Sequence, residues 1–286
     1  MIQDIYPHVL ANHYNEKAVP SGDSKVLVFQ EQDILARIRH DQELEYPSFA
    51  RTGAAKEDCT YLFRIDETEY FFLDLAAGEE LPGAADLYSE GWEFMNVRSL
   101  RRNVLEPRHE LFAAMTGKHL IDWYRDTAFC GRCGTPTGKS ATERAKVCPN
   151  CGYTMYPRIM PAVIVGVING DSILITKYRT GFAHNALIAG FTEIGETLEE
   201  TVAREVMEES GVRVKNITYY KSQPWGIAND ILAGFYCEVD GDTQIRMDSN
   251  ELKYAAWVRR EDIVLQPDDF SLTNEMMLRF KEGFRL

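Results

Sequence analysis

The sequence lacks any apolar stretch of the length that a membrane-spanning helix needs, about 20 residues. Its first residues, MIQDIYPHVLANHYNEK, have neither the basic start nor the apolar stretch of a signal peptide, so we expect a cytoplasmic protein with no membrane partner. Low-complexity segments and long blocks of like charge are also missing. The 286 residues are enough for one large domain or for two to three small ones.

Basic residues are comparatively few. Lys and Arg number 31 against 44 Asp and Glu, which gives a net charge of −13. A surface this acidic repels phosphate groups and argues against broad, non-specific binding of nucleic acid or anionic membranes. The sequence also has no G-x-G-x-x-G and no P-loop pattern, so a dinucleotide would have to bind by another route.

Four of the six cysteines form the pattern C-x2-C-x14-C-x2-C: Cys130, Cys133, Cys148 and Cys151. Each pair is followed by glycine, and two such knuckles joined by a hairpin-length spacer suit tetrahedral Zn²⁺. A redox pair or disulfides are the alternative, which we disfavour in a chain that looks cytoplasmic. Because the protein fills all four positions, we expect one structural Zn²⁺ per chain. The isolated Cys59 and Cys237 are expected to be buried apolar residues.

The cysteine segment separates two larger parts. Before it, the runs KVLVFQ, TYLFRI and EYFFLDL favour β-strands, and the apolar spacing predicts a helix over about Pro107–Tyr124. After it, apolar runs flank Asn169-Gly170 and predict a hairpin with a type I′ turn, and a last helix is expected over Leu272–Phe284. We therefore predict a fold of the α/β (α+β) class in three domains, namely a β-rich N-terminal domain (1–126), a zinc ribbon (127–156) and a C-terminal domain (157–286).

The segment GFTEIGETLEETVAREVMEESGV, residues 190–212, concentrates carboxylates. Apolar residues recur every four positions from Leu198 and predict a helix with one buried face. Between residues 196 and 209 six glutamates accompany a single arginine, and Glu205, Glu208 and Glu209 fall within about one turn, where like charges repel. A solvated helix is the simpler alternative, but such helices normally mix the two signs of charge. Hard divalent cations would neutralise the cluster, clamp a diphosphate and lower the pKa of water.

The same segment resembles the Nudix box, G-x5-E-x7-R-E-U-x-E-E-x-G-U with U aliphatic. It matches every defined position: Gly190, Glu196, Arg204, Glu205, Val206, Glu208, Glu209, Gly211 and Val212. The resemblance implies a Nudix fold, a mixed sheet between helices, and hydrolysis of a nucleoside diphosphate linked to another group. It implies that Glu205, Glu208 and Glu209 bind Mg²⁺ or Mn²⁺ or assist the attacking water, while Arg204 and Glu196 hold the loop and helix in shape.

Nearly the whole chain resembles the NADH pyrophosphatase branch of that family, through the cysteine ribbon, LIAGF and the sequence SQPW at 222–225. That resemblance implies a homodimer with a Nudix-like N-terminal domain that splits NAD(H) into nicotinamide mononucleotide and AMP. The residues implied to contact the dinucleotide are Phe191, Tyr156, Trp225, Gln223 and Ser222. Further implied ligands of the divalent metal are Glu251 and Ala189.

The branch signature continues SQPW-P-F-P-x-S, whereas this chain reads SQPWGIAND and places Gly226 and Asp230 where proline and serine are expected. Because this stretch is tied to the substrate, ADP-ribose, a dinucleoside polyphosphate and the NAD cap of RNA stay open as alternatives. For RNA, residues 125–158 hold six basic and two acidic side chains, although a zinc tetrathiolate offsets part of this excess. A catalytically inactive nucleotide sensor is a further alternative, but the box lacks none of its glutamates.

Overall fold

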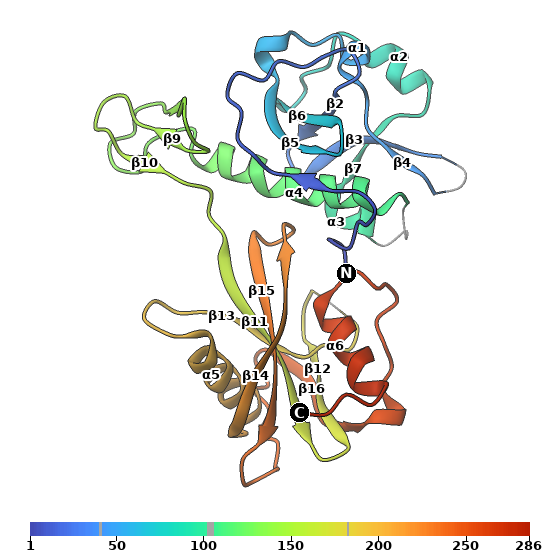
Figure 1. Ribbon diagram of the computed structural model, residues 1–286, viewed down its shortest axis with the longest axis vertical. Coiled ribbons are helices and arrows are strands. Elements are labelled where there is room, and N and C mark those ends of the chain that lie inside the picture. Colours follow the sequence, from blue (N-terminus) through green and yellow to red (C-terminus); the bar gives the residue numbers. More distant parts are fainter. Residues whose placement is uncertain (40–41, 102–105, 182) are drawn as a thin grey trace. The chain divides into compact units, whose positions relative to one another are not determined.

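A computed structural model describes residues 1–39, 42–101, 106–181 and 183–286 (Figure 1). The chain divides into two compact units, which we describe separately. The N-terminal unit comprises residues 2–158 and 226–229, and the C-terminal unit comprises Met1 with residues 159–225 and 230–286. None of the helices within the described ranges is both long enough and apolar enough to cross a membrane.

The N-terminal unit is built on a sheet in the order β1-β5-β6-β2-β3-β4, with β7 paired to β3. In this sheet β2 and β6 run parallel. The strands are β1 (Leu10–Ala11), β2 (Lys25–Gln30), β3 (Asp33–Ile38), β4 (Leu44–Glu45), β5 (Thr60–Ile65), β6 (Thr68–Leu75) and β7 (Glu93–Asn96). The three predicted strand runs are confirmed in β2, β5 and β6, because their β-branched and aromatic side chains fill the core of this unit.

The long helix of the N-terminal unit is α4 (Arg108–Asp126), which confirms the helix predicted from the apolar spacing. It starts directly after Pro107, whose φ of −74° suits a helix start. The shorter helices are α1 (Phe49–Thr52), η1 (Lys56–Asp58), α2 (Ala84–Ser89) and α3 (Val97–Leu100). After α4, the cysteine segment forms a small antiparallel sheet in the order β10-β9-β8, with strands β8 (Gly138–Lys139), β9 (Lys146–Val147) and β10 (Thr154–Met155).

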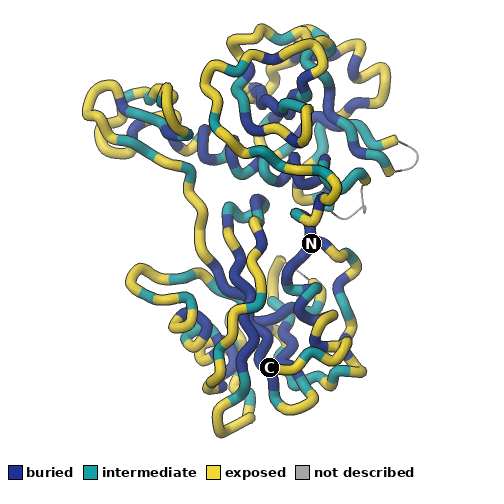
Figure 2. Tube along the Cα trace, viewed as in Figure 1, coloured by how far each residue is buried: buried dark blue, intermediate teal, exposed yellow. Residues whose placement is uncertain are grey.

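The C-terminal unit contains a mixed sheet in the order β14-β15-β11-β12-β16, with β13 paired to β11. Strands β11 and β15 run parallel, and the other pairs are antiparallel. The strands are β11 (Met160–Asn169), β12 (Ser172–Tyr178), β13 (Ile188–Phe191), β14 (Val214–Trp225), β15 (Asp230–Val239) and β16 (Leu252–Arg259). In Figure 2 the central strands of this sheet are mostly buried, whereas the loops that connect them are largely exposed.

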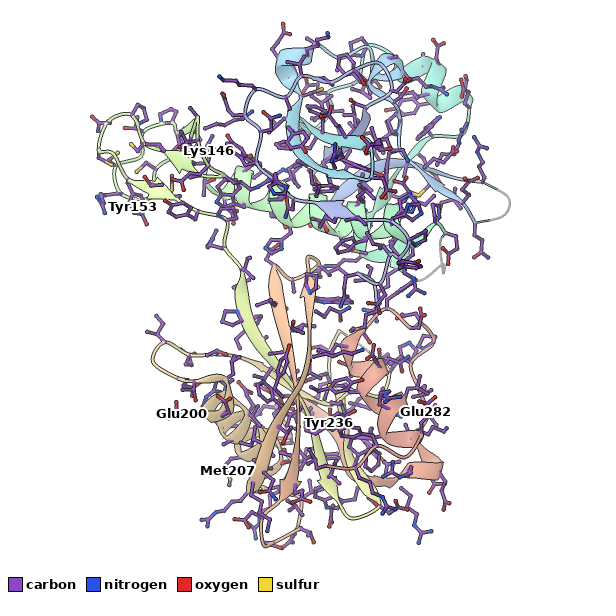
Figure 3. All side chains as sticks on the ribbon, in the orientation of Figure 1. Lys146, Tyr153, Glu200, Met207, Tyr236 and Glu282 are labelled. Carbon is purple, nitrogen blue, oxygen red and sulfur yellow. The ribbon has the colours of Figure 1, made fainter. Side chains whose placement is uncertain are left out.

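Helices cover both faces of this sheet (Figure 1). On one face, α5 (Leu198–Ser210) buries Val202 and Val206 against a core that includes Val163, Val165 and Phe235. On the other face, α6 (Leu272–Lys281) packs on a core that includes Ile164, Leu232 and Tyr236. Figure 3 labels Tyr236, whose hydroxyl donates to the Met276 carbonyl at 2.7 Å. The expected mixed sheet between helices is confirmed, as is the last helix, which ends at Lys281 rather than Phe284.

The hairpin predicted around Asn169-Gly170 forms, but its turn lies one residue later than expected. Asn169 pairs with Ser172, so Gly170 and Asp171 are the two loop residues. Only Gly170 of these has a positive φ, 59°, which is the pattern of a type II′ turn and not of the predicted type I′ turn. This register keeps Ile168 and Ile173 paired in the core.

The two large sheets repeat one strand order. In the C-terminal unit the run is β14-β15-β11-β12, and in the N-terminal unit it is β5-β6-β2-β3, each with a parallel pair at its centre. This repetition supports the expectation of a Nudix-like N-terminal domain, which, like the three-domain division, stays a prediction. The described residues between β3 and β5 hold only the short elements β4, α1 and η1, so that part of the sheet carries no counterpart of α5.

Candidate active site

Helix α5 carries the acidic run, and a capping box defines where the helix begins. The Thr197 hydroxyl accepts from the Glu200 N–H at 3.2 Å, and the Glu200 carboxylate accepts from the Thr197 N–H at 2.8 Å, which is a capping box. Burial of Val202 and Val206 sets the rotation of the helix about its axis. Glu200 and Met207, both exposed, lie on the outer side of α5 (Figure 3). The remaining edge of the helix carries the clustered glutamates.

Arg204 joins the loop, the strand and the helix. Its Nε and Nη2 atoms bond both oxygens of Glu196, at 2.6 and 2.9 Å, and Nη2 also donates to the Phe191 carbonyl at 2.9 Å. Its Nη1 donates to Glu205 at 2.7 Å and to Glu208 at 3.0 Å. The guanidinium lowers the pKa of Glu196 to about 2, so this bidentate pair is ionised at neutral pH. These contacts are the ones that the predicted role of Arg204 and Glu196 requires.

Glu205 lies against the backbone of β13. A Cβ built on Gly190 would overlap the carboxyl group of Glu205, so only glycine leaves room for that carboxylate. Burial raises the pKa of Glu205, and the adjacent Arg204 opposes this rise. The first glycine of the acidic segment therefore has a steric function that its spacing alone does not reveal.

Glu209 is the most deeply buried of the clustered glutamates. It is 2% exposed, and its Oε2 atom has no hydrogen-bond partner among the described residues. Burial raises its pKa to about 8, with further contributions from the negative charges of Glu205 and Glu251, while the backbone N–H of Ala189 acts in the opposite direction. Three predicted metal-site residues, Glu205 of α5, Ala189 of β13 and Glu251 directly before β16, thus affect the pKa of the Glu209 carboxyl group.

Tyr178 and Asp248 are near this group and did not emerge from the sequence. Burial raises the pKa of the Tyr178 phenol, as do the charges of Glu209, Glu251 and Glu205, whereas the nearby backbone N–H of Ala189 opposes this rise. The Asp248 N–H donates to the Glu209 carbonyl at 3.0 Å. Tyr178 ends β12 at a register shift, and no local pattern marks such a position.

A divalent cation fits this arrangement. The donors are carboxylate oxygens, which Mg²⁺ and Mn²⁺ prefer. Glu209 keeps an unpartnered oxygen, and burial with the charges of Glu205 and Glu251 disfavours its ionised form, which a bound cation would stabilise. In the described part of the chain, however, no three carboxylates offer oxygens within 4.8 Å of one another. Instead, Arg204 donates a hydrogen bond to one carboxylate oxygen of Glu205 and to one carboxylate oxygen of Glu208.

The four cysteines of the ribbon, by contrast, lie close enough together to bind one metal ion. All four Sγ atoms lie within 4.8 Å of one another, and the separations are 3.6 Å for Cys130–Cys151, 3.5 Å for Cys133–Cys148 and 3.6 Å for Cys133–Cys151. Disulfides would need about 2.05 Å. Four thiolates at about 2.3 Å from Zn²⁺ would be about 3.8 Å apart at tetrahedral geometry, so the cluster fits a structural zinc.

Most basic side chains of the ribbon region are engaged within their own unit. Arg144 donates to Asn12 and to the Leu62 carbonyl and lies over the Tyr14 ring, so it fastens the ribbon to the N-terminal sheet. The engaged cations are Arg125 with Asp74, Lys139 with Thr60, Lys146 with the Thr137 carbonyl, and Arg158 with Asp126. The exposed Arg132 stacks over Tyr153, at 4.5 Å from the ring centre. The basic excess of this region is therefore weaker support for RNA binding than its composition indicated.

The residues predicted to contact a dinucleotide differ in their exposure. Phe191 is 51% exposed, Trp225 is half-buried against the core under α6, and Ser222 is exposed. Tyr156 is 55% exposed and its hydroxyl donates to Glu143 within the N-terminal unit. Gln223 is fully buried, with its amide bonded to the Phe270 carbonyl and the Leu272 N–H. These bonds give Gln223 the role of holding the start of α6, and we do not propose substrate contact for it.

The departure at Gly226 has a steric reason. A Cβ at this position would overlap the carbonyl oxygen of Met115 in α4, with which Gly226 shares the N-terminal unit. A glycine in place of proline would by itself loosen a loop. The structure instead shows a close backbone approach that neither proline nor any other side chain permits without movement.

Two families match this chain. The family described as "NUDIX domain" matches residues 158–280, and the family described as "NADH pyrophosphatase zinc ribbon domain" matches residues 125–156. The chain is 44% identical over 170 residues to the "NAD-capped RNA hydrolase NudC" of Citrobacter koseri, covering 58% of this chain and 65% of that protein. The protein of the same name from Klebsiella pneumoniae is 43% identical over 206 residues, covering 67% of this chain and 79% of the relative.

The chain thus spans about 65% of the length of the Citrobacter koseri relative. Among solved structures, it is similar to the crystal structure of a NUDIX hydrolase from Nitrosomonas europaea, with 22% identity and a TM-score of 0.48. That similarity covers 54% of this chain and 90% of the other.

Proposed function

The chain belongs to the Nudix hydrolase family and carries the zinc ribbon of its NADH pyrophosphatases, and from this premise we propose that it hydrolyses the pyrophosphate of NAD(H). Water would attack one phosphorus, the bond from that phosphorus to the bridging oxygen would break, and nicotinamide mononucleotide and AMP would be released. The observation that carries the proposal is the α5 cluster, in which Arg204 fixes three glutamates while a fourth, Glu209, keeps an unpartnered oxygen.

The residues that would hold Mg²⁺ or Mn²⁺ are Glu205, Glu208, Glu209 and Glu251, together with the backbone of Ala189. Once bound, the ion would neutralise pyrophosphate charge and acidify water. Arg204 and Glu196 would keep the loop and helix in register, and Gly190 would leave space for Glu205.

The remaining protein contribution is recognition of the bases. The exposed ring of Phe191 would stack on one base, and Trp225 would border the same site. Ser222 would contribute a polar contact, and the resemblance names Tyr156 as a further contact of the dinucleotide. We propose these roles from the resemblance and from the exposure of the side chains.

The test is a substrate panel with Mg²⁺ or Mn²⁺, with products identified by mass spectrometry. We expect NAD⁺ and NADH to give AMP and the corresponding mononucleotide faster than ADP-ribose or diadenosine polyphosphates are cleaved. Equal, slow cleavage of all four would mean that SQPWGIAND no longer specifies nicotinamide. Tight NADH binding without any product would favour a nucleotide sensor instead.

A second candidate substrate is NAD-capped RNA, because the relatives in Citrobacter koseri and Klebsiella pneumoniae carry that substrate in their names. Arg132 is the exposed cation of the ribbon region that lies over an aromatic ring, an arrangement that stacks unpaired bases. Charge reversal at Arg132 should weaken RNA binding in a salt-dependent manner. Arg144 is unsuitable for this test because its reversal would break the ribbon's attachment to the N-terminal sheet.

We further propose a homodimer located in the cytoplasm. The dimer rests on the resemblance to the branch, and light scattering of the purified protein at several concentrations tests it. A monomeric mass at all concentrations would contradict it. Fractionation of cells that express the tagged chain tests the location.

A further inference from the structure

Asp230 is a buried acid that the proposed reaction does not use. It is 6% exposed, and its Oδ1 atom has no hydrogen-bond partner among the described residues. Burial alone raises its pKa to about 7. An unpaired buried carboxyl costs folding free energy, and proteins retain such groups mainly where a ligand or a reaction uses them.

The strand register places Asp230 at a defined end of the C-terminal sheet. It is the first residue of β15, and it pairs with Trp225, the last residue of β14, and with Met160, the first residue of β11. Two residues further along β11, Ala162 pairs with Phe191 at the end of β13. The ends of these strands therefore meet at one end of the sheet.

These side chains also share one face. Paired residues point to the same side of a sheet, and residues two apart along a strand do so as well. Ala162 and Leu232 both belong to the core under α6, so Phe191 and Asp230 lie on that same face, as does Trp225. Strands β13, β11 and β15 are successive neighbours (Figure 1). Two strand spacings and an offset of two residues along the strands therefore place the Cα atoms of Phe191 and Asp230 about 12 Å apart.

From this juxtaposition we propose that Asp230 determines specificity at the base-stacking end of the site and favours the cationic, oxidised nicotinamide ring over the neutral, reduced one. The inference rests on the proposed function. A stacked nicotinamide on Phe191 would lie over the same sheet face as the unpaired carboxyl. A carboxylate in a poorly solvated position attracts a positive ring far more strongly than it would in water. NAD⁺ and NADH differ at this ring only, so their comparison isolates the effect.

The experiment compares kcat/KM for NAD⁺ and NADH at pH 8 in the unmodified protein, Asp230→Asn and Asp230→Ser. We expect the NAD⁺:NADH ratio to fall by about tenfold or more in both variants, because each removes the charge. The ratio is internal to each preparation, so a partly unfolded sample leaves it unchanged. Asp262→Asn, which removes an exposed charge in the same unit, is the matched control and should keep the ratio.

Binding gives a readout that does not require turnover. Dissociation constants for the two nucleotides, measured by calorimetry without added divalent metal, should shift in the same direction as the kinetic ratio. An unchanged ratio in Asp230→Asn overturns the inference, and so does an equal loss for both nucleotides, which would place Asp230 near the adenosine half. If the unmodified protein cleaves neither nucleotide, the proposed function fails, and the binding comparison still decides the role of Asp230.

Discussion

The carboxyl group of Glu205 occupies the space in which Gly190 would carry a side chain. A Cβ at position 190 would force this carboxyl group to another position. Gly190 of β13 therefore determines the space available to Glu205, a proposed metal ligand fifteen positions later in the chain.

Gly190→Ala should therefore displace Glu205 and lower kcat by about 100-fold or more, since displacements near 1 Å have effects of this size. Steady-state kinetics with saturating Mg²⁺ or Mn²⁺ would measure it. Gly22→Ala is the control, because its added Cβ would meet only the Ala50 Cβ at 3.8 Å. Normal kcat in Gly190→Ala would show that the position of Glu205 does not matter to the reaction.

Glu209→Gln should slow turnover by on the order of 100-fold and weaken binding of the divalent metal. The same change should stabilise the metal-free protein at pH 8, because it removes a buried carboxyl that Glu205 and Glu251 repel. Thermal melting with and without Mn²⁺ tests both effects. Metal should raise the Tm of the unmodified protein more than that of the variant. Near-full activity at saturating metal would remove Glu209 from the proposed site.

Arg204→Lys should lower activity by about 10- to 100-fold, because an ammonium group cannot bond Glu196 in a bidentate manner and also reach Glu205 and Glu208. Hydrogen exchange should become faster in residues 191–197, whose geometry depends on that contact. The exposed Arg213, changed to Lys, serves as the control. Unaltered exchange in this loop would mean that the loop holds its conformation without Arg204.

Cys133→Ser should reduce the zinc content from one ion per chain to none and unfold the ribbon, because binding and folding of such sites are coupled. Elemental analysis and protection of residues 130–151 from proteolysis would measure the two effects. Cys59→Ala removes a thiol that lies outside the cluster and should retain the zinc. Full zinc occupancy in Cys133→Ser would contradict a four-cysteine site.

Stability should fall as the pH rises from about 4 to 7, in part because of Asp230. Its folded pKa of about 7 lies above the unfolded value near 4, so the folded state binds more protons in this window and loses that advantage once the group ionises. Asp230→Asn should flatten this slope and stabilise the protein at pH 8 by at most about 4 kcal/mol. Denaturant unfolding at pH 5 and pH 8 checks the sign. A slope identical in both proteins would mean that Asp230 ionises without penalty.

The structure changes what two sequence signals mean. A glycine in place of proline normally makes a loop more flexible, but the backbone of Gly226 is packed against the Met115 carbonyl. Arg144 counted toward a basic surface, but its guanidinium is used to bond Asn12 and Leu62. Composition and spacing cannot distinguish these cases, because both depend on partners more than 80 residues away in the chain.

The sequence by itself determined the acidic helix, the zinc ribbon, the long helix after Pro107 and several of the longer strands, because these depend on local periodicity and on fixed spacings of chemically specific residues. Only the tertiary structure decided which carboxylate keeps an unpartnered oxygen, that Tyr178 stands beside Glu209, and that Asp230 shares a sheet face with Phe191. Those relationships arise from strand register and from the packing of α5 on the sheet. Both are fixed by long-range pairing, in which a shift of one residue would turn every side chain to the opposite face.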